Sequence, residues 1–257
     1  MGKVTAQLLA TNGYTVYAAA RRMEQMEDLE QAGIKIILMD ITNDLSMNNG
    51  VDKIIEAERR IDILINNAGF GLMGSVEDVP LTRARDQMEV NVFGLARLTQ
   101  LVLPFMRKQQ SGKIVNITST SGKMATPLSG WYAASKFAVE ALSDSLRLEV
   151  KPFGIDVIII EPGGVKSEWG DIALKSLHEI SLGTAYSTMA AKIIEFAREA
   201  QHKNAEPMVI AELILEALES TKPKVRYHGG YMAGAILLLK KLLTDRQFDN
   251  LLTRQMK

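Results

Sequence analysis

Short apolar runs alternate along this chain with longer segments of helical periodicity. The runs are residues 14–20, 34–39, 61–65, 112–118 and 155–160. Apolar runs of this length, without a regular alternation of polar side chains, are typical of strands that are buried on both faces of a parallel sheet. The helical segments between them provide the crossovers that parallel strands require. The pattern therefore predicts an α/β fold, a doubly wound parallel sheet with helices on both faces.

The length and composition of the chain fit one globular domain. A chain of 257 residues is long enough to bury a sizeable core, and no linker, repeat or low-complexity segment divides it. Apolar residues make up 47%, charged residues 23%, and the formal net charge is zero, so no basic excess points to a nucleic-acid partner. We therefore expect residues 1–257 to form a single domain.

Three absences narrow the class of protein further. The chain has no cysteine, which excludes disulfides and thiolate metal sites, and no metal site is expected. The first residues lack the charged and apolar parts of a secretory signal, so a cytoplasmic location is expected. The apolar segment 233–239 is too short to span a bilayer. Its simplest interpretation is a core helix, with peripheral membrane contact as the alternative.

The segment Gly130-Trp131-Tyr132-Ala133-Ala134-Ser135-Lys136 carries the pair of residues with the clearest chemistry. On a helix, Tyr132 and Lys136 lie one turn apart on the same face. A phenol has an ordinary pKa of about 10, and a fixed ammonium beside it favours the phenolate and lowers that pKa. Tyr132 would then exchange a proton near neutral pH as a general acid or base.

The residues before this segment, 114–119, read as a buried strand that ends in hydroxyl side chains. Ser119, at the end of that strand and facing the start of the next helix, is well placed to hold a carbonyl oxygen. Taken alone, a tyrosine and a lysine four residues apart most often form an ordinary amphipathic face without chemistry. The wider context of motifs decides between these two interpretations.

Four motifs occur in the order expected for one family. They are Asn66-Asn67-Ala68-Gly69, Asn91-Val92-Phe93-Gly94, Ser119 with Tyr132-x-x-x-Lys136, and Pro162-Gly163-Gly164. On these motifs the chain resembles the short-chain dehydrogenase/reductase family over essentially its whole length. Residues 223–227 resemble the short edge strand of its hydroxysteroid and retinol dehydrogenase-like branch. The resemblance implies a Rossmann-type fold and reversible hydride transfer between a nicotinamide cofactor and a carbonyl or alcohol substrate.

The resemblance also implies a role for each catalytic position. Ser119 donates a hydrogen bond to the carbonyl oxygen, and Tyr132 delivers the proton. Lys136 lowers the pKa of Tyr132 and binds the nicotinamide ribose. Asn91 matches the position at which a bulge in the long helix 82–108 orders a water molecule that relays protons to the lysine.

Cofactor contacts follow from the same motifs, at the carboxyl ends of the strands where ligands bind in such folds. The resemblance places these residues against the cofactor: Gly2, Asp40, Ile41, Asn67, Ala68, Gly69, Tyr132, Lys136, Pro162, Gly163, Val165 and Ser167. Asp40 and Ile41 would lie against the adenine, and the turn at Pro162 and Gly163 would pack on the nicotinamide. Ser167 replaces the usual threonine and keeps its hydroxyl.

Arg21 bears on the choice between the two nicotinamide cofactors. Proteins of this fold that prefer NAD usually carry an acid near this point, where it binds the ribose 2′-hydroxyl. Here an alanine is followed by Arg21, whose planar guanidinium suits a 2′-phosphate. We therefore favour NADP, with NAD as the alternative; Arg21 would otherwise only begin a solvated helix.

The start of the chain departs from the family pattern. Family members begin with a strand and a glycine-rich turn that presents backbone N–H groups to the cofactor pyrophosphate. Met1 and Gly2 match only the last two positions of that turn, and the absent strand would lie between the strands 14–20 and 61–66. We expect the natural protein to have about a dozen or more residues before Met1, enough for one strand and one turn. A truncated, inactive paralogue is the alternative.

Residues 166–207 match the position of the family's substrate lid. Their apolar residues are irregularly spaced and include Trp169, Leu174, Leu177 and Tyr186. Exposed apolar side chains on a mobile segment would indicate a lipophilic substrate. A pair of ordinary helices that fill the fold is an almost equally good interpretation.

A catalytically silent nucleotide-binding or scaffold protein is the competing function. The incomplete phosphate turn supports it, and the complete catalytic set argues against it. Family members usually pair through the helices that carry Asn91 and Tyr132, so a homodimer or homotetramer is expected.

Overall fold

The computed structural model describes residues 1–254, and all its paired strands are parallel, as the sequence predicts. The strands are β1 (Tyr17–Ala20), β2 (Lys35–Leu38), β3 (Ile63–Asn66), β4 (Gly112–Ile117), β5 (Ile155–Pro162) and β6 (Arg226–Gly229). β1 and β2 pair with each other, and β3, β4, β5 and β6 form a second sheet in that order. The expected short strand near residue 225 is therefore confirmed as β6, at the edge of the larger sheet.

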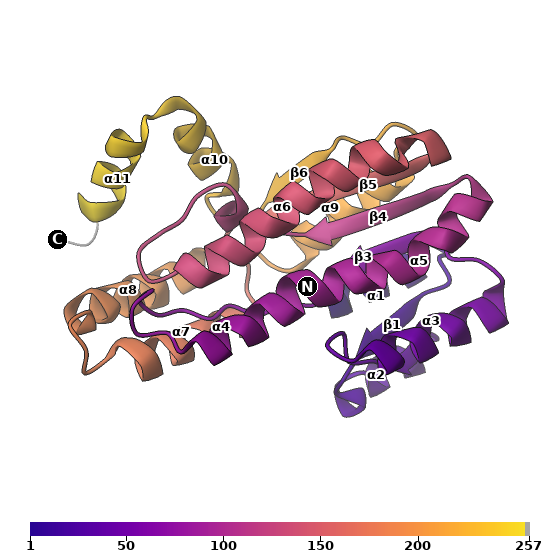
Figure 1. The fold of residues 1–257 in the computed structure, drawn as a ribbon, viewed down its shortest axis with the longest axis horizontal. Helices are drawn as coiled ribbons and strands as arrows, with labels where there is room; N and C mark the ends of the chain where they lie inside the picture. The colour runs from indigo at the N-terminus through magenta and orange to yellow at the C-terminus, as the bar shows by residue number, and fades with distance from the viewer. Residues whose placement is uncertain (255–257) are drawn as a thin grey trace.

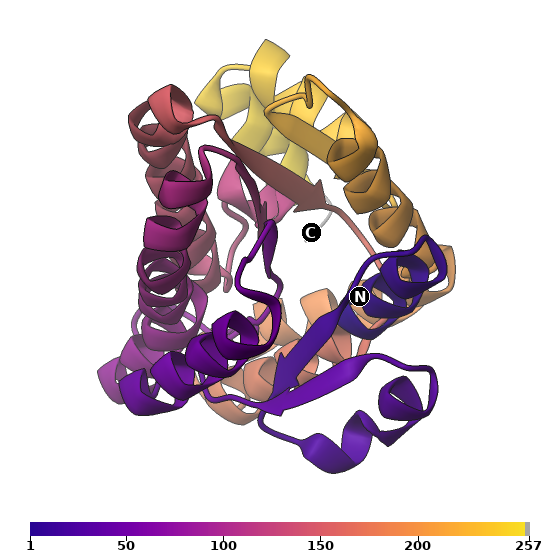
Figure 2. The same ribbon diagram turned by 90° about the vertical axis from the view of Figure 1, so that its right-hand side faces the viewer.

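The helices account for the segments of helical periodicity. In the first half they are α1 (Gly2–Thr11), α2 (Glu27–Gln31), α3 (Asp44–Glu58), α4 (Leu81–Met88) and α5 (Leu95–Gln109). In the second half they are α6 (Gly130–Val150), α7 (Glu168–Ser181), α8 (Ser187–Ala200), α9 (Met208–Glu219), α10 (Ala233–Leu242) and α11 (Asp245–Arg254). Helices α5 and α6 cover one face of the larger sheet, and α1 and α9 cover the other (Figures 1 and 2). The doubly wound arrangement is confirmed.

Two apolar cores lie on the two faces of the larger sheet. Ile114 and Val157 pack with residues of α3 and α5, whereas Val115 and Ile158 pack with residues of α1 and α9. Successive strand side chains point to opposite faces, so a strand covered on both sides needs an apolar residue at nearly every position. Burying each such side chain contributes about 1.5–3 kcal/mol to the stability of the fold. This gain favours apolar residues along the strands, so the strands could be recognised in the sequence.

The sheet is divided between β1 and β3. No strand pairing joins these two strands within residues 1–254. Most of their residues are only half-buried, in contrast to the nearly continuous burial of β4 and β5. The division falls where the family resemblance places a further strand. This division agrees with the gap expected between residues 14–20 and 61–66.

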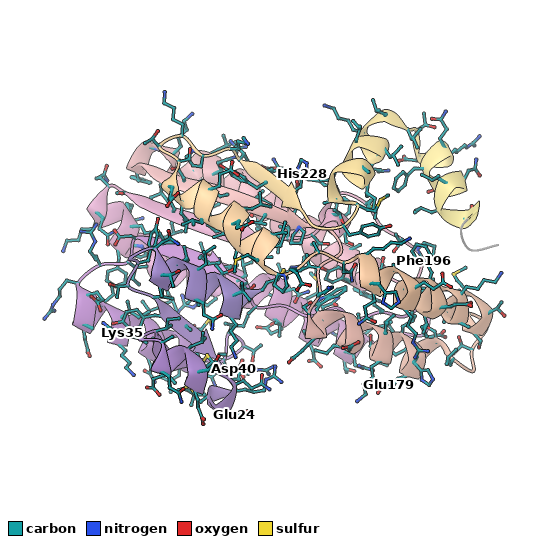
Figure 3. All side chains as sticks on the ribbon, turned by 180° about the vertical axis from the view of Figure 1, so that it is seen from behind. Glu24, Lys35, Asp40, Glu179, Phe196 and His228 are labelled. Atoms are coloured by element: carbon teal, nitrogen blue, oxygen red, sulfur yellow. The ribbon has the colours of Figure 1, made fainter. Side chains whose placement is uncertain are left out.

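The carboxyl ends of the strands point to the side of the molecule where α7 and α8 lie. Figure 1 shows this for β4 and β6, and in Figure 3 Lys35 and Asp40 mark the start of β2 and the position just beyond its end. A buried polar chain holds α6 against this side: the Asn66 amide donates to the Asn116 side-chain oxygen at 2.8 Å, and the Asn116 amide donates to Ser143 on α6 at 2.8 Å. The helix that carries Tyr132 is thereby aligned with the strand ends.

The core-helix interpretation of segment 233–239 is wrong. In α10 only Ala233 is buried, and Leu238 is 56% exposed. The reason is geometric, because α10 touches β6 and the turn after β4 mainly through its first residues and then runs along the surface toward α11 (Figure 1). None of the helices in the described part of the chain has the length and hydropathy that crossing a membrane requires.

Candidate active site

Ser119 and Tyr132 meet at the carboxyl end of β4. Ser119 follows the last residues of that strand, and Tyr132 lies in the first turn of α6. The Ser119 hydroxyl lies close enough to that of Tyr132 to act on its pKa, and Tyr132 is only 6% exposed. The two groups expected to handle a carbonyl oxygen therefore lie side by side in a place from which water is largely excluded.

Lys136 lies one turn further along α6, as its spacing from Tyr132 predicts. Its ammonium lies 5.9 Å from the centroid of the Tyr132 ring and donates a hydrogen bond of 2.9 Å to the Ile117 carbonyl oxygen. The side chain is buried, with 6% exposure. Lys136 is thus held beside the tyrosine through the backbone of β4.

The expected lowering of the Tyr132 pKa by Lys136 does not occur in this structure. Burial raises the pKa of Tyr132 to about 12, opposed in part by the hydrogen bond with Ser119. Burial also lowers the pKa of Lys136 to about 8, opposed in part by the charge of Glu140. The reason is that both groups are desolvated while the ammonium is directed to the Ile117 carbonyl. Tyr132 is therefore protonated at neutral pH, the state of a proton donor.

Asn91 lies in a bulge of the long helix, as the resemblance implies. Residues Glu89–Gly94 form a π-helix between α4 and α5. The Asn91 amide donates to the Phe70 carbonyl at 2.9 Å and to Ser135 at 3.0 Å, and its oxygen accepts from the Phe70 N–H at 3.0 Å. π-Bulges occur often at functional sites. Here the bulge lets one side chain join the loop after β3 to α6.

The loop after β3 and the start of α1 form the part of the site that suits a phosphate group. Asn67, Ala68 and Gly69 are exposed. A Cβ placed on Gly2 would lie 2.6 Å from the Asn67 side-chain nitrogen, and one placed on Gly69 would lie 3.6 Å from the Lys136 ammonium. No side chain caps the N-terminus of α1. These free N–H groups and the positive end of the helix dipole fit an anion such as a pyrophosphate.

Asp40, Ile41 and Arg21 lie near one another beyond the ends of β2 and β1. Asp40 accepts hydrogen bonds from the Thr42 N–H at 2.9 Å and the Thr42 hydroxyl at 2.7 Å. These bonds, with a smaller effect of the Arg21 charge, hold the pKa of Asp40 below its ordinary value. Asp40 therefore shapes its own turn, and the exposed Arg21 guanidinium remains near it.

Replacing Gly94 with alanine is expected to lower the free energy of unfolding by about 1–3 kcal/mol. A Cβ at this position would overlap the backbone carbonyl oxygen of Ile41, which cannot move without shifting the Asp40 turn. Gly170 is the matched control, because a Cβ there has no neighbour within 4 Å and the residue lies within α7. Gly170→Ala should instead raise the free energy of unfolding by about 0.5–1 kcal/mol. Urea unfolding of both variants checks the difference in sign.

The end of β5 and the turn after it lie next to Ser119. The Ser119 hydroxyl is 3.5 Å from the Pro162 carbonyl oxygen, and the Gly163 N–H donates to the Gly229 carbonyl at 2.8 Å. Val165 makes an isolated parallel bridge with Ala205. Ser167 is exposed at the start of α7, and its hydroxyl does not cap the helix. These four residues thus run from the last residue of β5 to the start of α7, with Pro162 nearest to Ser119.

The residues expected in the substrate lid separate into two groups. Trp169 reaches the site, since its ring centroid is 4.9 Å from that of Tyr132. Leu177 is completely buried between α7 and α8, and Leu174 and Tyr186 pack against the same cluster. Leu177 therefore has no surface to offer a substrate, because helices α7 and α8 need an apolar core of their own. For these three residues the structure favours the ordinary-helix interpretation.

Two residues of the site were not predicted from the sequence. Ser135 accepts the hydrogen bond from Asn91 and donates to the Tyr132 carbonyl at 2.7 Å. Glu140 lies one turn after Lys136 and is 4% exposed. An acid four residues after a lysine in the middle of an apolar helix face was a signal that could have identified Glu140.

The chain is similar to known proteins over most of its length. Residues 1–176 match the family described as short chain dehydrogenase. The chain is 33% identical over 242 residues to a 3-ketodihydrosphingosine reductase of Bacteroides thetaiotaomicron, covering 93% of this chain and 87% of that protein. It is 30% identical over 270 residues to an NADPH-dependent 3-dehydrocapnine reductase of Ornithobacterium rhinotracheale, covering 100% of this chain and 94% of that protein.

A solved structure agrees over the whole chain. The crystal structure of a short-chain dehydrogenase from Streptomyces avermitilis matches with a TM-score of 0.81 at 30% identity, covering 100% of this chain and 94% of that one. The doubly wound sheet agrees with these similarities. The hydroxyl groups of Ser119 and Tyr132, which lie beside the buried Lys136, agree with them as well. The chain belongs to the short-chain dehydrogenase/reductase family, a family of nicotinamide-dependent oxidoreductases.

Proposed function

We propose that this protein reduces a carbonyl group to an alcohol, with Tyr132 as the proton donor. The observation that carries the proposal is the buried, protonated Tyr132 hydroxyl, which lies beside Ser119. A bound nicotinamide would supply the hydride to the carbonyl carbon. The carbonyl oxygen would accept a hydrogen bond from Ser119 and take the proton of Tyr132 as negative charge develops on it. Lys136 would bind the nicotinamide ribose, and Asn91 would sustain the proton relay.

Consumption of NADPH with a panel of steroid, long-chain and short aliphatic ketones tests the proposal. We expect turnover of at least one class, followed by formation of the matching alcohol. Tight binding of NADPH without turnover of any ketone, or of the corresponding alcohols with NADP, would favour the catalytically silent scaffold instead.

NADP is the proposed cofactor, with NAD as the alternative. Arg21 supports this choice, because it is exposed at the end of β1 and lies near the Asp40 turn. Arg21→Ala should lower kcat/KM for NADPH about tenfold and leave that for NADH nearly unchanged, since one charge-assisted contact with the 2′-phosphate is lost. Arg22 is the matched control: it pairs with Glu168 at 3.6 Å, and its replacement should leave the cofactor ratio unaltered. An equal effect of the two substitutions would contradict the assignment of Arg21.

A lipophilic substrate under a lid formed by residues 166–207 is also proposed. Trp169 lies over the Tyr132 ring and would be displaced by, or stack on, an apolar substrate. Met189 and Phe196 expose 36% and 55% of their surface on α8, where Figure 3 shows Phe196. The hydroxysteroid and retinol dehydrogenase-like branch stays a prediction.

Self-association is proposed through the outer face of α6. Phe137 and Leu148, eleven residues apart and therefore on the same side of the helix, expose 44% and 64% of their surface there. Large apolar side chains gathered on one helix face are typical of a contact between subunits. Light scattering should then give the mass of a homodimer or homotetramer.

A further inference from the structure

A cluster of charged residues built around two buried acids adjoins Lys136, and the proposed reaction assigns no role to it. We call it the Glu140 cluster. Its members are Glu140 on α6, Asp144 on α6, Lys123 after β4, Glu161 on β5 and Arg226 on β6. Glu140 and Glu161 are 4% and 3% exposed. Burying several charges is costly unless they are paired, so a cluster of this kind next to a site calls for an explanation.

Glu140 is the centre of the cluster. One of its carboxylate oxygens accepts a hydrogen bond of 2.8 Å from Thr118, the residue before Ser119. The other accepts from the Arg226 guanidinium at 3.1 and 3.0 Å and pairs with the Lys123 ammonium at 2.6 Å. A Cβ on Gly122 would lie 2.9 Å from the Glu140 side chain, so the turn after Ser119 also depends on the close approach of this residue. Glu140 thus contacts the backbone segment that carries the catalytic serine.

The charge of Glu140 also reaches Lys136. Burial lowers the pKa of Lys136 to about 8, and the Glu140 charge acts in the opposite direction. Glu161, the other buried acid, has its pKa raised to about 7 by burial and by the Glu140 charge. Near neutral pH Glu161 is therefore partly protonated. Its negative charge then stabilises the Lys136 ammonium less than a fully ionised carboxylate would. Asp144 lies two turns from Lys136 and is directed to Arg226, at 2.6 Å.

We propose that Glu140 is a positioning residue for the reaction, whose carboxylate keeps Lys136 charged in its buried site while it holds the Thr118–Ser119 segment in place. The proposal rests on the proposed function, because that function gives the charged form of Lys136 its role. A lysine that must hold a ribose as an ammonium needs its proton, and burial alone disfavours this charged form. The acid one turn along the same helix restores it.

Three variants separate the charge of Glu140 from its hydrogen bond. Glu140→Gln removes the charge and keeps an oxygen for Thr118, whereas Glu140→Asp keeps the charge on a shorter side chain. Asp144→Asn is the matched control, since it removes an acid from the same Arg226. Loss of a neighbouring anion disfavours the charged form of Lys136. In Glu140→Gln the pKa of Lys136 should therefore fall by about one unit. In the Glu140→Asp and Asp144→Asn variants, the pKa of Lys136 should stay nearly the same as in the unchanged protein.

Two measurements report this titration. The first is the NMR titration of the Lys136 side-chain Cε resonance, assigned with a Lys136→Met variant. The second is the alkaline limb of kcat/KM for carbonyl reduction against pH, which should move with the resonance. The NMR measurement needs no substrate, so a shift without turnover would refute the proposed function and leave the role of Glu140 supported. An unchanged titration in folded Glu140→Gln, or an equal shift in Asp144→Asn, would overturn the proposal.

Lys123→Met keeps the proposal testable should Glu140→Gln fail to fold. The Lys123 side chain is 33% exposed, so its replacement should be tolerated. Removing a cation that neutralises the Glu140 carboxylate should move the Lys136 titration toward alkali, opposite to the effect of Glu140→Gln. A Lys136 titration that does not move in Lys123→Met would count against Glu140 as the source of the effect.

Discussion

Replacing Tyr132 with phenylalanine is expected to lower kcat for carbonyl reduction by about 10²–10⁴-fold, the range that positioned proton transfer contributes. The substitution removes one oxygen and leaves the ring, so its contact with Trp169 should remain. The Kd for NADPH, measured by fluorescence titration, should change less than about twofold, because the hydroxyl acts mainly on the reacting oxygen.

Tyr227 is the control for this substitution. It is another buried tyrosine, 5% exposed, and its hydroxyl accepts a hydrogen bond from the Lys224 N–H at 3.1 Å, away from the site. Tyr227→Phe should cost about 1 kcal/mol in the free energy of unfolding and leave kcat unchanged. Near-normal turnover in Tyr132→Phe would refute Tyr132 as the proton donor.

Replacing Lys136 with methionine is expected to lower kcat by a similar factor and also to raise the Kd for NADPH about tenfold. Methionine fills much of the same buried space but removes the ammonium and its hydrogen bond to the Ile117 carbonyl. The combined loss distinguishes this variant from Tyr132→Phe, in which cofactor binding is retained. Steady-state kinetics and fluorescence titration of the two variants side by side give the comparison.

Lys113 provides the control for the loss of a half-buried ammonium. Its ammonium donates to the backbone carbonyl oxygens of Leu218 at 2.6 Å and Ser220 at 2.7 Å, at the end of α9. Lys113→Met should therefore lower the free energy of unfolding by about 1–3 kcal/mol with little change in kcat or Kd. Unaltered cofactor affinity in Lys136→Met would mean that the lysine has no part in binding the ribose.

The strands and the positions of the proposed catalytic residues could be predicted because each leaves a local mark in the sequence. Strands β4 and β5 are buried at nearly every position, since both faces are covered. Tyr132 and Lys136 share a helix, so their separation alone places them on one face. Ser119 follows from its position after β4. These features depend on residues close together in the chain, or on burial common to a whole strand.

What could not be predicted depends on contacts between distant segments. The pKa of Tyr132 is set by how completely the folded protein excludes water around it, and spacing along a helix carries no such information. Leu177 and Leu238 illustrate the same limit, because an apolar side chain becomes core or surface according to the neighbours it meets. Glu140 acquires its partners from β6 and from the turn after β4.

The π-helical segment around Asn91 has a consequence for the rest of α5. A widened turn of this kind accommodates one residue more than an α-helical turn. Deleting a single residue from Glu89–Gly94 would remove that extra residue and restore a regular turn, so the side chains of α5 would keep their direction. Val102 and Met106, now 2% and 0% exposed, would stay against the sheet. The Asn91 amide, in contrast, depends on the widened turn for its position, so such a deletion would displace this amide and spare the packing of α5.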